Sequence, residues 1–338
     1  MRIILINVHA GTRSRIASGR IAVGDTDTSN YACAQVLGSL DPALAEGDII
    51  ACQAGWQDYQ VISSSAGPFG YGPPSELVKA LNGTSCQWTY TFRPAMVKMW
   101  PADVLMDVFG TSGMTAYFGL RECGPLMPSD AVAVAATTGS VGSIAAQLAR
   151  IAGCRVVGFA GGQDRCDWAV KTLGLHRCLD YRAADLDDQF RDTFPDGIDV
   201  YSDGVGGALT ETVLQHVNRN GRLFSYGTSA SFHSQPTSGP RPAGSLRQVR
   251  GITPNVEQLL ADRNIKSAVW IVDEFYHERL AAEDDLSRLL RSGALQPVNT
   301  VIDGFDSVPT AVAGLYSAPR VGKVQVRFAA NPGDRPAS

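Results

Sequence analysis

The chain has 338 residues, of which 44% are hydrophobic and 18% charged, and its formal net charge is −4. This length allows two domains, and the composition is that of a globular protein and excludes a disordered or fibrous one. The negative balance, without a concentrated basic face, argues against nucleic acid as the main partner and favours a small-molecule ligand.

The N-terminal residues MRIILINVHAGTRSR hold an apolar run too short for a signal-peptide core or a membrane span. The seven cysteines are scattered and form no C-x-x-C pair, which is typical of reduced thiols and not of disulfides or structural zinc. The five histidines form no pair at helical ligand spacing. We therefore expect a cytoplasmic protein with no metal site and no membrane association.

Both ends of the chain contain short runs with the pattern of β-strands. Over the first hundred residues Gly, Pro, Ser and Thr interrupt short alternating runs such as DIIAC (48–52), and near the other end VGKVQVRF (321–328) reads as a plain strand. Residues 1–100 and 298–338 are therefore predicted to form one β-rich lobe.

Residues 101–297 show a different pattern, in which apolar runs alternate with helical segments. Such alternation is typical of βαβ units and a parallel sheet, so we predict an α/β fold with a doubly wound Rossmann domain inserted in the β-rich lobe. The expected strands lie at 131–135, 155–159, 178–180, 198–201, 222–226 and 268–272, with helices between them and a last helix at 278–290. The polar, Pro- and Gly-rich stretch 231–251 is predicted to be a loop on the active-site side or a partly mobile lid.

The first strand of this domain leads into the turn AATTGSVGS (135–143) and then a helix. A strand, a tight turn and a helix bring free backbone N–H groups and the positive end of a helix dipole to one point, where an anion binds. Gly139 would let the backbone approach a pyrophosphate, and Gly142 would let the helix pack close to the strand. The pattern also fits an ordinary strand-to-helix turn, but its place at the head of a βαβ unit favours a dinucleotide. The residues assigned to the cofactor here are Thr138, Gly139, Ser140, Val141 and Gly142.

The second strand ends in FAGGQDRC (159–166), with no carboxylate at its tip. A ribose 2′-hydroxyl is usually met there by Asp or Glu, and a 2′-phosphate by small residues and a cation. Gly161 and Gly162 leave room, and Arg165 follows within one turn, so the sequence predicts NADP(H). The alternative for Arg165 is a solvent-facing helix cation.

Several runs together carry a family resemblance: GWQDYQV (55–61), GMTAYFGL (113–120), AATTGSVGSIAAQLA (135–149), DGIDVYSDGVGG (196–207) and VGKVQV (321–326). With them the chain resembles the zinc-independent, NADP(H)-dependent medium-chain dehydrogenase/reductases, most closely the branch of prostaglandin reductases, leukotriene hydroxydehydrogenases and 2-alkenal reductases. The resemblance implies a GroES-like catalytic lobe beside the Rossmann domain and usually a homodimer.

The resemblance also implies site residues. It places Thr115 near the nicotinamide, and Gly162, Arg165 and Tyr181 around the 2′-phosphate. Further cofactor positions are implied at Gly161, Gly204, Gly227, Thr228, Ser229 and Arg320.

The chain departs from the family pattern at several points. NVHAGTR (7–13) keeps Arg13 but has His9 and Ala10 in place of an Asp-Pro pair, and an insertion at 72–104 brings extra aromatic residues. Phe232 stands where the branch has a tyrosine that reaches cofactor and substrate, and Arg320 where it has an asparagine. The residues expected to contact the substrate are Trp56, Trp88, Tyr90 and Phe232.

Conjugate reduction of an α,β-unsaturated carbonyl compound is the natural chemistry without a metal, because only the enolate oxygen needs stabilising while hydride adds to the β-carbon. The candidates for holding the enolate or supplying the proton are Tyr59, Tyr117, Tyr226 and His233. For the tyrosines the alternative is packing, and for His233 it is an exposed loop position. Two other functions stay open: a tailoring reductase of a specialised metabolite acting on a quinone, carbonyl or imine, and a module that binds NADPH without turnover.

Overall fold

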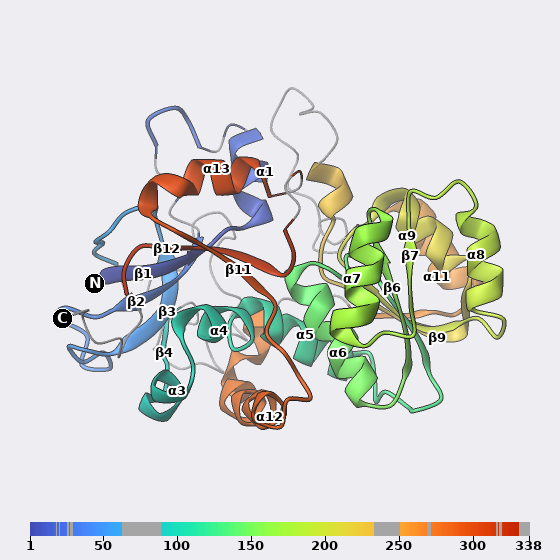
Figure 1. Cartoon of the computed structure of the whole chain (residues 1–338), viewed down its shortest axis with the longest axis horizontal. Coiled ribbons are helices and arrows are strands. Elements are labelled where there is room, and N and C mark those ends of the chain that lie inside the picture. Colours follow the sequence, from blue (N-terminus) through green and yellow to red (C-terminus); the bar gives the residue numbers. More distant parts are fainter. Residues whose placement is uncertain are drawn as a thin grey trace.

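The computed structural model describes residues 1–17, 19, 21–25, 27, 30–62, 89–232, 251–268, 272–315, 317 and 320–330. These residues form two lobes that lie side by side, each built on a six-stranded sheet (Figure 1). The α/β class, with a doubly wound parallel sheet beside a β-rich lobe, is confirmed.

The β-rich lobe takes its strands from both ends of the chain. Its sheet has the order β11-β12-β1-β2-β3-β4, with β1 paired antiparallel to both β2 and β12. The strands are β1 (Arg2–Asn7), β2 (Asn30–Gln35), β3 (Ile49–Ala54), β4 (Tyr90–Thr91), β11 (Asn299–Asp303) and β12 (Lys323–Arg327). Both faces of β1 are buried, which its unbroken apolar run IILI requires.

The Rossmann sheet has the order β10-β9-β8-β5-β6-β7, and all of its pairings are parallel. This is the doubly wound order, whose switch point between β5 and β8 is where such sheets bind ligands. The strands are β5 (Ala131–Val134), β6 (Arg155–Ala160), β7 (Arg177–Asp180), β8 (Ile198–Asp203), β9 (Val217–Ser225) and β10 (Lys266–Ala268). Its helices are α6 (Ser140–Ile151), α7 (Gln163–Leu173), α8 (Leu186–Thr193), α9 (Gly207–Leu214) and α11 (Pro254–Asp262).

A helical layer fills the space between the two sheets (Figure 1). It consists of α3 (Pro94–Met99), α4 (Ala102–Asp107), α5 (Thr111–Glu122), η2 (Val272–Glu278) and α12 (Arg279–Arg291). Gly119 brings α5 onto the Rossmann sheet, because a Cβ there would stand 1.9 Å from the Phe224 ring of β9. The remaining elements are α1 (Ala10–Ala17), η1 (Ser229–Phe232), η3 (Phe305–Ser307) and α13 (Val308–Ala313).

The strand expected at 268–272 lies largely outside the described residues. β10 is Lys266–Ala268, in register with Arg222–Phe224 of β9, and Val272 already begins η2. Val272 and Tyr276 face the core between the lobes, so their apolar pattern reflects burial of a 3₁₀ turn and not a strand. The domain boundaries near residues 100 and 298 stay a prediction. In the described part of the chain no helix is long and apolar enough to span a membrane.

Candidate functional site

The glycine turn lies between β5 and α6, at the switch point of the sheet. Gly139 caps α6 with an ordinary φ of −89°, while a Cβ on Gly142 would stand 2.3 Å from the carbonyl oxygen of Ala136. Gly142 is therefore needed for packing of the helix against the turn, and Gly139 leaves the mouth of the turn open. The first backbone N–H groups of α6 face that mouth, which is the arrangement that binds a phosphate.

Thr137 fixes the shape of this turn, and sequence reasoning missed it. Its hydroxyl donates to the carbonyl oxygen of Val134 at 2.6 Å and accepts from the backbone N–H of Phe159 at 2.9 Å. Gly158 makes the contact possible, because a Cβ there would lie 2.6 Å from the Thr137 oxygen. The side chain is fully buried, so it shapes the site without lining it.

The β-rich lobe touches the turn directly. Gly322 donates its backbone N–H to the carbonyl oxygen of Thr138 at 2.7 Å, and Gly322 and Gly139 form a parallel bridge. Two residues earlier, the Nη1 atom of Arg320 is buried and has no hydrogen-bond partner within the described residues. A buried guanidinium nitrogen without an acceptor is costly, so this atom is a candidate ligand for an anion bound at the turn.

The tip of β6 holds no available carboxylate. Gly162 has a φ of +99°, which a glycine adopts without strain. The nearest acid, Asp180, uses one oxygen to accept from the backbone N–H groups of Gly162 at 2.9 Å and Arg182 at 3.0 Å. Asp180 therefore organises the loop instead of presenting its charge to a ribose hydroxyl.

Two side chains cover the neighbouring glycine. A Cβ on Gly161 would lie 2.8 Å from the Tyr181 hydroxyl and 3.0 Å from the Arg182 guanidinium. The guanidinium carbon of Arg182 in turn lies over the Tyr181 ring, 5.5 Å from its centre. Arg165 is half-buried in the first turn of α7. Sequence reasoning missed Arg182, although its place directly after Tyr181 at the end of β7 was a usable signal.

Residues at the ends of β8 and β9 form a further side of the candidate cofactor site. Asp203 accepts hydrogen bonds from the N–H groups of Val205 at 2.8 Å and Gly206 at 3.2 Å, and burial raises the pKa of this carboxyl. The N–H of Ser229 donates to the carbonyl oxygen of Gly204 at 3.1 Å, which places the 227–229 turn against the end of β8. The structure thus brings together the residues expected around the cofactor at β5, β8 and β9.

Tyr226 and Tyr117, two candidates for chemistry, have their hydroxyl groups engaged. Tyr226 donates to the carbonyl oxygen of Ala135 at 3.3 Å, and burial raises the pKa of its phenol. Tyr117 donates to Asp285 of α12 at 2.7 Å, and burial together with Asp285 raises the pKa of Tyr117 to about 12. Thr115, one half-turn earlier on α5, is half-buried.

The residues expected near the substrate are more scattered. Tyr59 is 63% exposed, and Trp56 packs against the apolar face of the β-rich sheet. Tyr90 donates to the carbonyl oxygen of Phe109 at 3.2 Å and packs between aromatic rings of the core. Trp88, His233 and the side chain of Phe232 lie outside the described residues.

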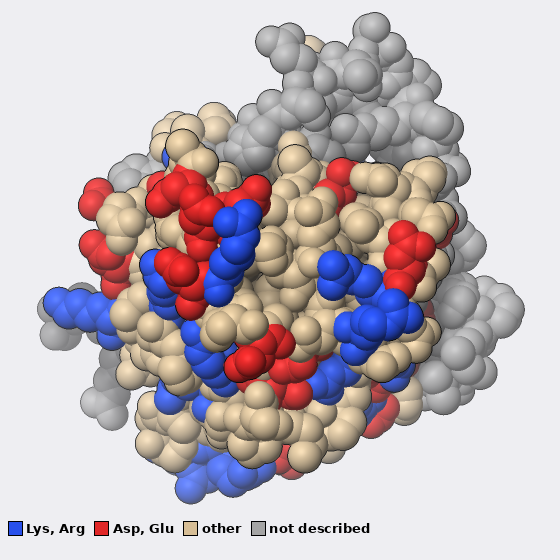
Figure 2. Space-filling model, turned by 90° about the vertical axis from the view of Figure 1, so that its right-hand side faces the viewer, with Lys and Arg blue, Asp and Glu red and all other residues tan. Residues whose placement is uncertain are grey.

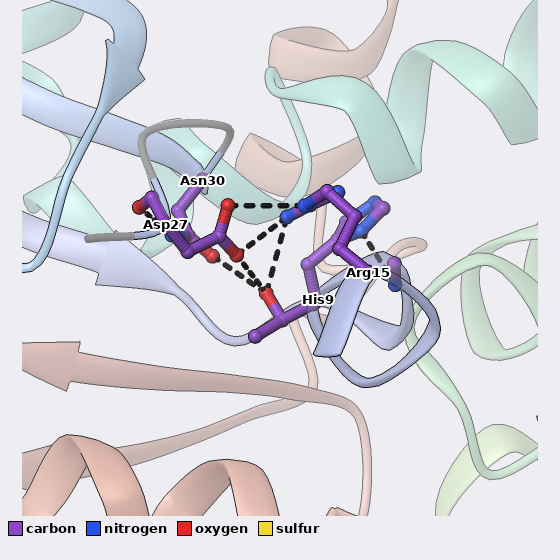
Figure 3. A network of polar contacts seen from close by, with 6 residues as sticks. His9, Arg15, Asp27 and Asn30 are labelled. Carbon is purple, nitrogen blue, oxygen red and sulfur yellow. Dashed lines mark hydrogen bonds and ion pairs between the residues drawn. The ribbon is translucent and has the colours of Figure 1, made fainter. Parts of the chain in front are cut away.

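A buried polar network anchors α1 beside the site (Figure 3). Arg15 binds Asp27 through two nitrogens, at 2.6 and 3.0 Å, and the Thr12 hydroxyl donates to the same carboxylate at 2.7 Å. The ring of His9 accepts the backbone N–H of Gly11 on Nδ1 at 3.0 Å, so the neutral ring carries its proton on Nε2. Sequence reasoning pointed to Arg13, whose side chain is not among the described ones, and missed Arg15.

Within the described residues, no group of three or more His, Cys, Asp or Glu side chains could hold a metal ion. On the described part of the Rossmann face in Figure 2, basic and acidic side chains intermix, and no large area carries one sign.

Comparison with known proteins shows which reductases the chain is similar to. A family model described as zinc-binding dehydrogenase matches residues 140–255, within the Rossmann domain. Prostaglandin reductase 1 of Oryctolagus cuniculus is 29% identical over 331 residues, covering 95% of this chain and 83% of that protein. The NADP(+)-dependent 2-alkenal reductase of Nicotiana tabacum is 29% identical over 297 residues, covering 87% and 75%.

A solved structure agrees over nearly the whole chain. The crystal structure of CurA in complex with NADPH from Vibrio vulnificus has a TM-score of 0.74 and 25% identity, covering 99% of this chain and 89% of that one. Its fold includes both lobes, so the likeness is not confined to the nucleotide-binding domain. The chain is thus similar, over most of its length, to NADP-dependent prostaglandin and alkenal reductases, and its Rossmann domain matches the zinc-binding dehydrogenase family model.

Proposed function

We propose that the protein is an NADPH-dependent, metal-free reductase that adds hydride to the C=C bond of an α,β-unsaturated carbonyl compound. The observation that carries this proposal is the pairing of an open glycine turn at β5 with a tip of β6 where Arg165 and Arg182 lie and where one oxygen of Asp180 is engaged by backbone N–H groups. The relatives named prostaglandin reductase and 2-alkenal reductase, and the NADPH complex of CurA, support it.

The turn would hold the pyrophosphate through the N–H groups at the start of α6, with Arg320 as a second ligand from the β-rich lobe. At the tip of β6, Gly161 and Gly162 leave space for the 2′-phosphate, and Tyr181, Arg182 and Arg165 surround that space. A guanidinium fork matches a phosphate dianion in both charge and geometry. The site would therefore prefer the phosphorylated coenzyme.

When bound, the nicotinamide supplies the hydride. The work of the chain is to orient it against the β-carbon of the substrate, to exclude water and to stabilise the enolate oxygen. Thr115 and the 227–229 turn flank the expected position of the nicotinamide, and Trp56, Trp88, Tyr90 and Phe232 stay proposed substrate contacts. Tyr59, Tyr117, Tyr226 and His233 stay proposed candidates for holding the enolate or the proton.

Consumption of NADPH with a panel of alkenals, cyclic enones and quinones tests the function. We expect turnover with enones, NADPH preferred over NADH, and a saturated carbonyl product identified by mass spectrometry. NADPH binding without turnover across the panel would overturn the proposal in favour of a binding module. Reduction of quinones alone would overturn it in favour of the tailoring alternative.

Arg165→Ala sharpens the cofactor assignment. Loss of a charge-assisted contact of about 1.5–3 kcal/mol should raise the Michaelis constant for NADPH far more than that for NADH. Equal effects on both cofactors would remove Arg165 from the phosphate site.

Two further features belong to the proposal. We propose a homodimer and a cytoplasmic location; the unpaired thiols of the described cysteines favour a reducing compartment. Light scattering of the purified protein and fractionation of the producing cells test these two features.

A further inference from the structure

Two cysteines face each other where α7 packs on β7 of the Rossmann sheet. Cys166 lies on the inner face of α7 together with Ala169 and Leu173, at the i, i+3 and i+7 spacing of one helix face. Cys178 lies in β7, and the two cysteines belong to one apolar cluster, with Cys166 1% and Cys178 8% exposed. The packing of the helix on the sheet therefore brings both cysteines into the same layer.

The alternation of side chains along β7 explains why the two thiols meet. Cys178 and Leu179 are neighbours in the strand, but they pack in different apolar clusters, on opposite faces of the sheet. The cluster of Cys178 also holds Ala160 of β6 and Ala169 of α7. Cys178 therefore points to the face of the sheet that α7 covers.

The two thiols are joined by a hydrogen bond, in which Cys178 donates to the sulfur of Cys166. This bond lowers the pKa of Cys166, against the opposing effects of burial and of the charge on Asp180. It also raises the pKa of Cys178, as burial does. A backbone hydrogen bond with Ala160 holds the Cys166 sulfur at the end of β6. Cys166 is thus the sulfur that more readily becomes a nucleophilic thiolate, and Cys178 is a second thiol in contact with it.

Other described cysteines lie in less reactive places. Cys33 and Cys52 are on neighbouring strands, one residue out of register, but they pack in different apolar clusters on opposite faces of the β-rich sheet. Their side chains therefore point away from each other. Burial raises the pKa of Cys123 to about 12 and that of Cys154 to about 11, which makes these thiols poor nucleophiles at neutral pH.

The pair at α7 adjoins the proposed 2′-phosphate position. Cys166 directly follows Arg165, and its backbone N–H donates to the carbonyl oxygen of Gly162 at 3.2 Å in the first turn of α7. Cys178 stands two residues before Asp180, whose carboxylate accepts the N–H of Gly162 at 2.9 Å. A movement of either sulfur is therefore transmitted to the loop that carries Gly162 and Arg165.

We propose that Cys166 and Cys178 are a redox modification site, which hydrogen peroxide converts into an intrachain disulfide that weakens NADPH binding. The effect on NADPH rests on the proposed function, whereas formation of the disulfide does not. A disulfide holds its sulfurs about 2 Å apart, closer than two hydrogen-bonded thiols, so the first turn of α7 must move toward β7 and take Arg165 with it. In a reducing compartment, disulfides of this kind are transient and sense oxidants.

The oxidation is a balanced two-electron step. The Cys166 thiolate attacks one oxygen of the peroxide, the O–O bond breaks, and hydroxide leaves, which gives a sulfenic acid. The Cys178 sulfur then attacks the Cys166 sulfur, so that the S–O bond breaks and the S–S bond forms. Two thiols and one peroxide thus give one disulfide and two water molecules. A dithiol reductant reverses the change by thiol–disulfide exchange.

Mass spectrometry of the whole protein after peroxide treatment tests the modification. In the wild type we expect the loss of two hydrogen atoms per chain, a proteolytic peptide pair linked through Cys166 and Cys178, and reversal by dithiothreitol. Cys166→Ala and Cys178→Ala should each abolish the linked pair, whereas Cys123→Ala, which removes a buried thiol at the end of α5, is the matched control and should retain it. Absence of the link in the wild type, or a link from either cysteine to a different one, would overturn the proposal.

Titration with NADPH and NADH tests the consequence for the cofactor. In the oxidised wild type the dissociation constant for NADPH should rise about tenfold, as expected for loss of one charge-assisted contact, while that for NADH changes by less than about twofold. Dithiothreitol should restore the affinity, and peroxide-treated Cys166→Ala should bind NADPH as tightly as the reduced wild type. A disulfide that leaves NADPH affinity unchanged would overturn the proposal. Failure of the proposed function is distinguishable, because the reduced wild type would then show no preference for NADPH although the disulfide still forms.

Discussion

The N–H of Gly322 and the carbonyl oxygen of Thr138 form a 2.7 Å hydrogen bond that ties the last strand of the β-rich lobe to the anion-binding turn of the Rossmann domain. Gly322 adopts a φ of +70°, and a Cβ there would stand 1.7 Å from the carbonyl oxygen of Val298. The bond thus depends on a backbone position that only glycine fits. The proposed cofactor site is shaped by both lobes at this point.

Gly322→Ala should be strongly destabilising, by about 3 kcal/mol or more, because it combines backbone strain with a clash against backbone. Gly293→Ala is the matched control: Gly293 has a similar φ of +73° but open space around its Cβ position. It should cost only the strain of about 1–2 kcal/mol. Urea denaturation of both variants measures the difference, and equal losses would contradict the assigned clash.

Two glycines of the turn should separate folding from cofactor binding. Gly139→Ala keeps an ordinary φ and has its nearest neighbour at 3.1 Å, so the free energy of unfolding should change by less than about 1 kcal/mol while NADPH affinity falls about tenfold. Gly142→Ala clashes with Ala136 and should lose stability by about 1–3 kcal/mol. Thermal unfolding and fluorescence titration with NADPH check both. Unchanged affinity in Gly139→Ala would remove the turn from the cofactor site.

Arg182→Ala should weaken binding of 2′,5′-ADP about tenfold and leave binding of 5′-AMP unchanged, because its guanidinium lies over Gly161 at the proposed phosphate position. Arg191, an exposed residue of α8 paired with Asp188, is the control. Calorimetric titration with the two nucleotides measures the ratio. Equal weakening of both ligands would show that Arg182 supports the loop and does not select the phosphate.

Asp27→Asn should destabilise the fold by about 3 kcal/mol, because it leaves the Arg15 guanidinium buried beside a neutral partner. The same substitution at Asp188, whose bridge to Arg191 is largely exposed, should cost less than about 0.5 kcal/mol. Chemical denaturation distinguishes the two. If Asp27→Asn is as mild as the control, the network of Figure 3 does not anchor α1.

Tyr117→Phe should lower stability by about 1 kcal/mol in a defined pH window, after allowance for solvent screening of Asp285. The bond lowers the pKa of Asp285, so its contribution is present above the unfolded pKa of that acid and is lost as pH falls below it. Burial, together with this bond, raises the pKa of Tyr117 to about 12, so the contribution of the bond is also lost as pH rises from about 10 through 12.

Stability of the wild type and of Tyr117→Phe, measured from about pH 2 to about pH 12, should therefore differ over the neutral range and converge toward both extremes. A difference that does not depend on pH would indicate loss of packing alone. Unchanged kcat in this variant would remove Tyr117 from the candidates for chemistry, whereas a large loss would restore it.

Much of the fold follows from local pattern. The glycine turn, the αL stop of α7 at Gly174 and the alternation of apolar runs with helices are set by neighbouring residues, so the sequence alone predicts them. The strand expected at 268–272 does not extend to Val272, because Val272 begins a 3₁₀ turn that is buried against helices from distant parts of the chain. An apolar run records burial, but it does not say which element is buried.

In the candidate site, too, some features follow from local sequence and others depend on tertiary contacts. Gly139, Gly142 and Gly162 lie in motifs that a sequence displays, and the structure places them at the ends of the neighbouring strands β5 and β6. Gly322 and Thr138 are far apart in the chain, and only the packing of the two lobes joins them by a hydrogen bond. Arg182 is significant only because β7 ends beside Gly161. Chemistry that depends on tertiary contacts leaves no local pattern.

The position of β12 between β1 and β11 has a consequence for biosynthesis. β1 is synthesised before the Rossmann domain and β12 after it, so the two neighbouring strands leave the ribosome far apart in time. The strands of the Rossmann sheet are contiguous, from Ala131 to Ala268, so that domain can fold before β12 has been made. Until β12 emerges, one edge of β1 remains unpaired, and a nascent chain in that state is where a chaperone would be needed most.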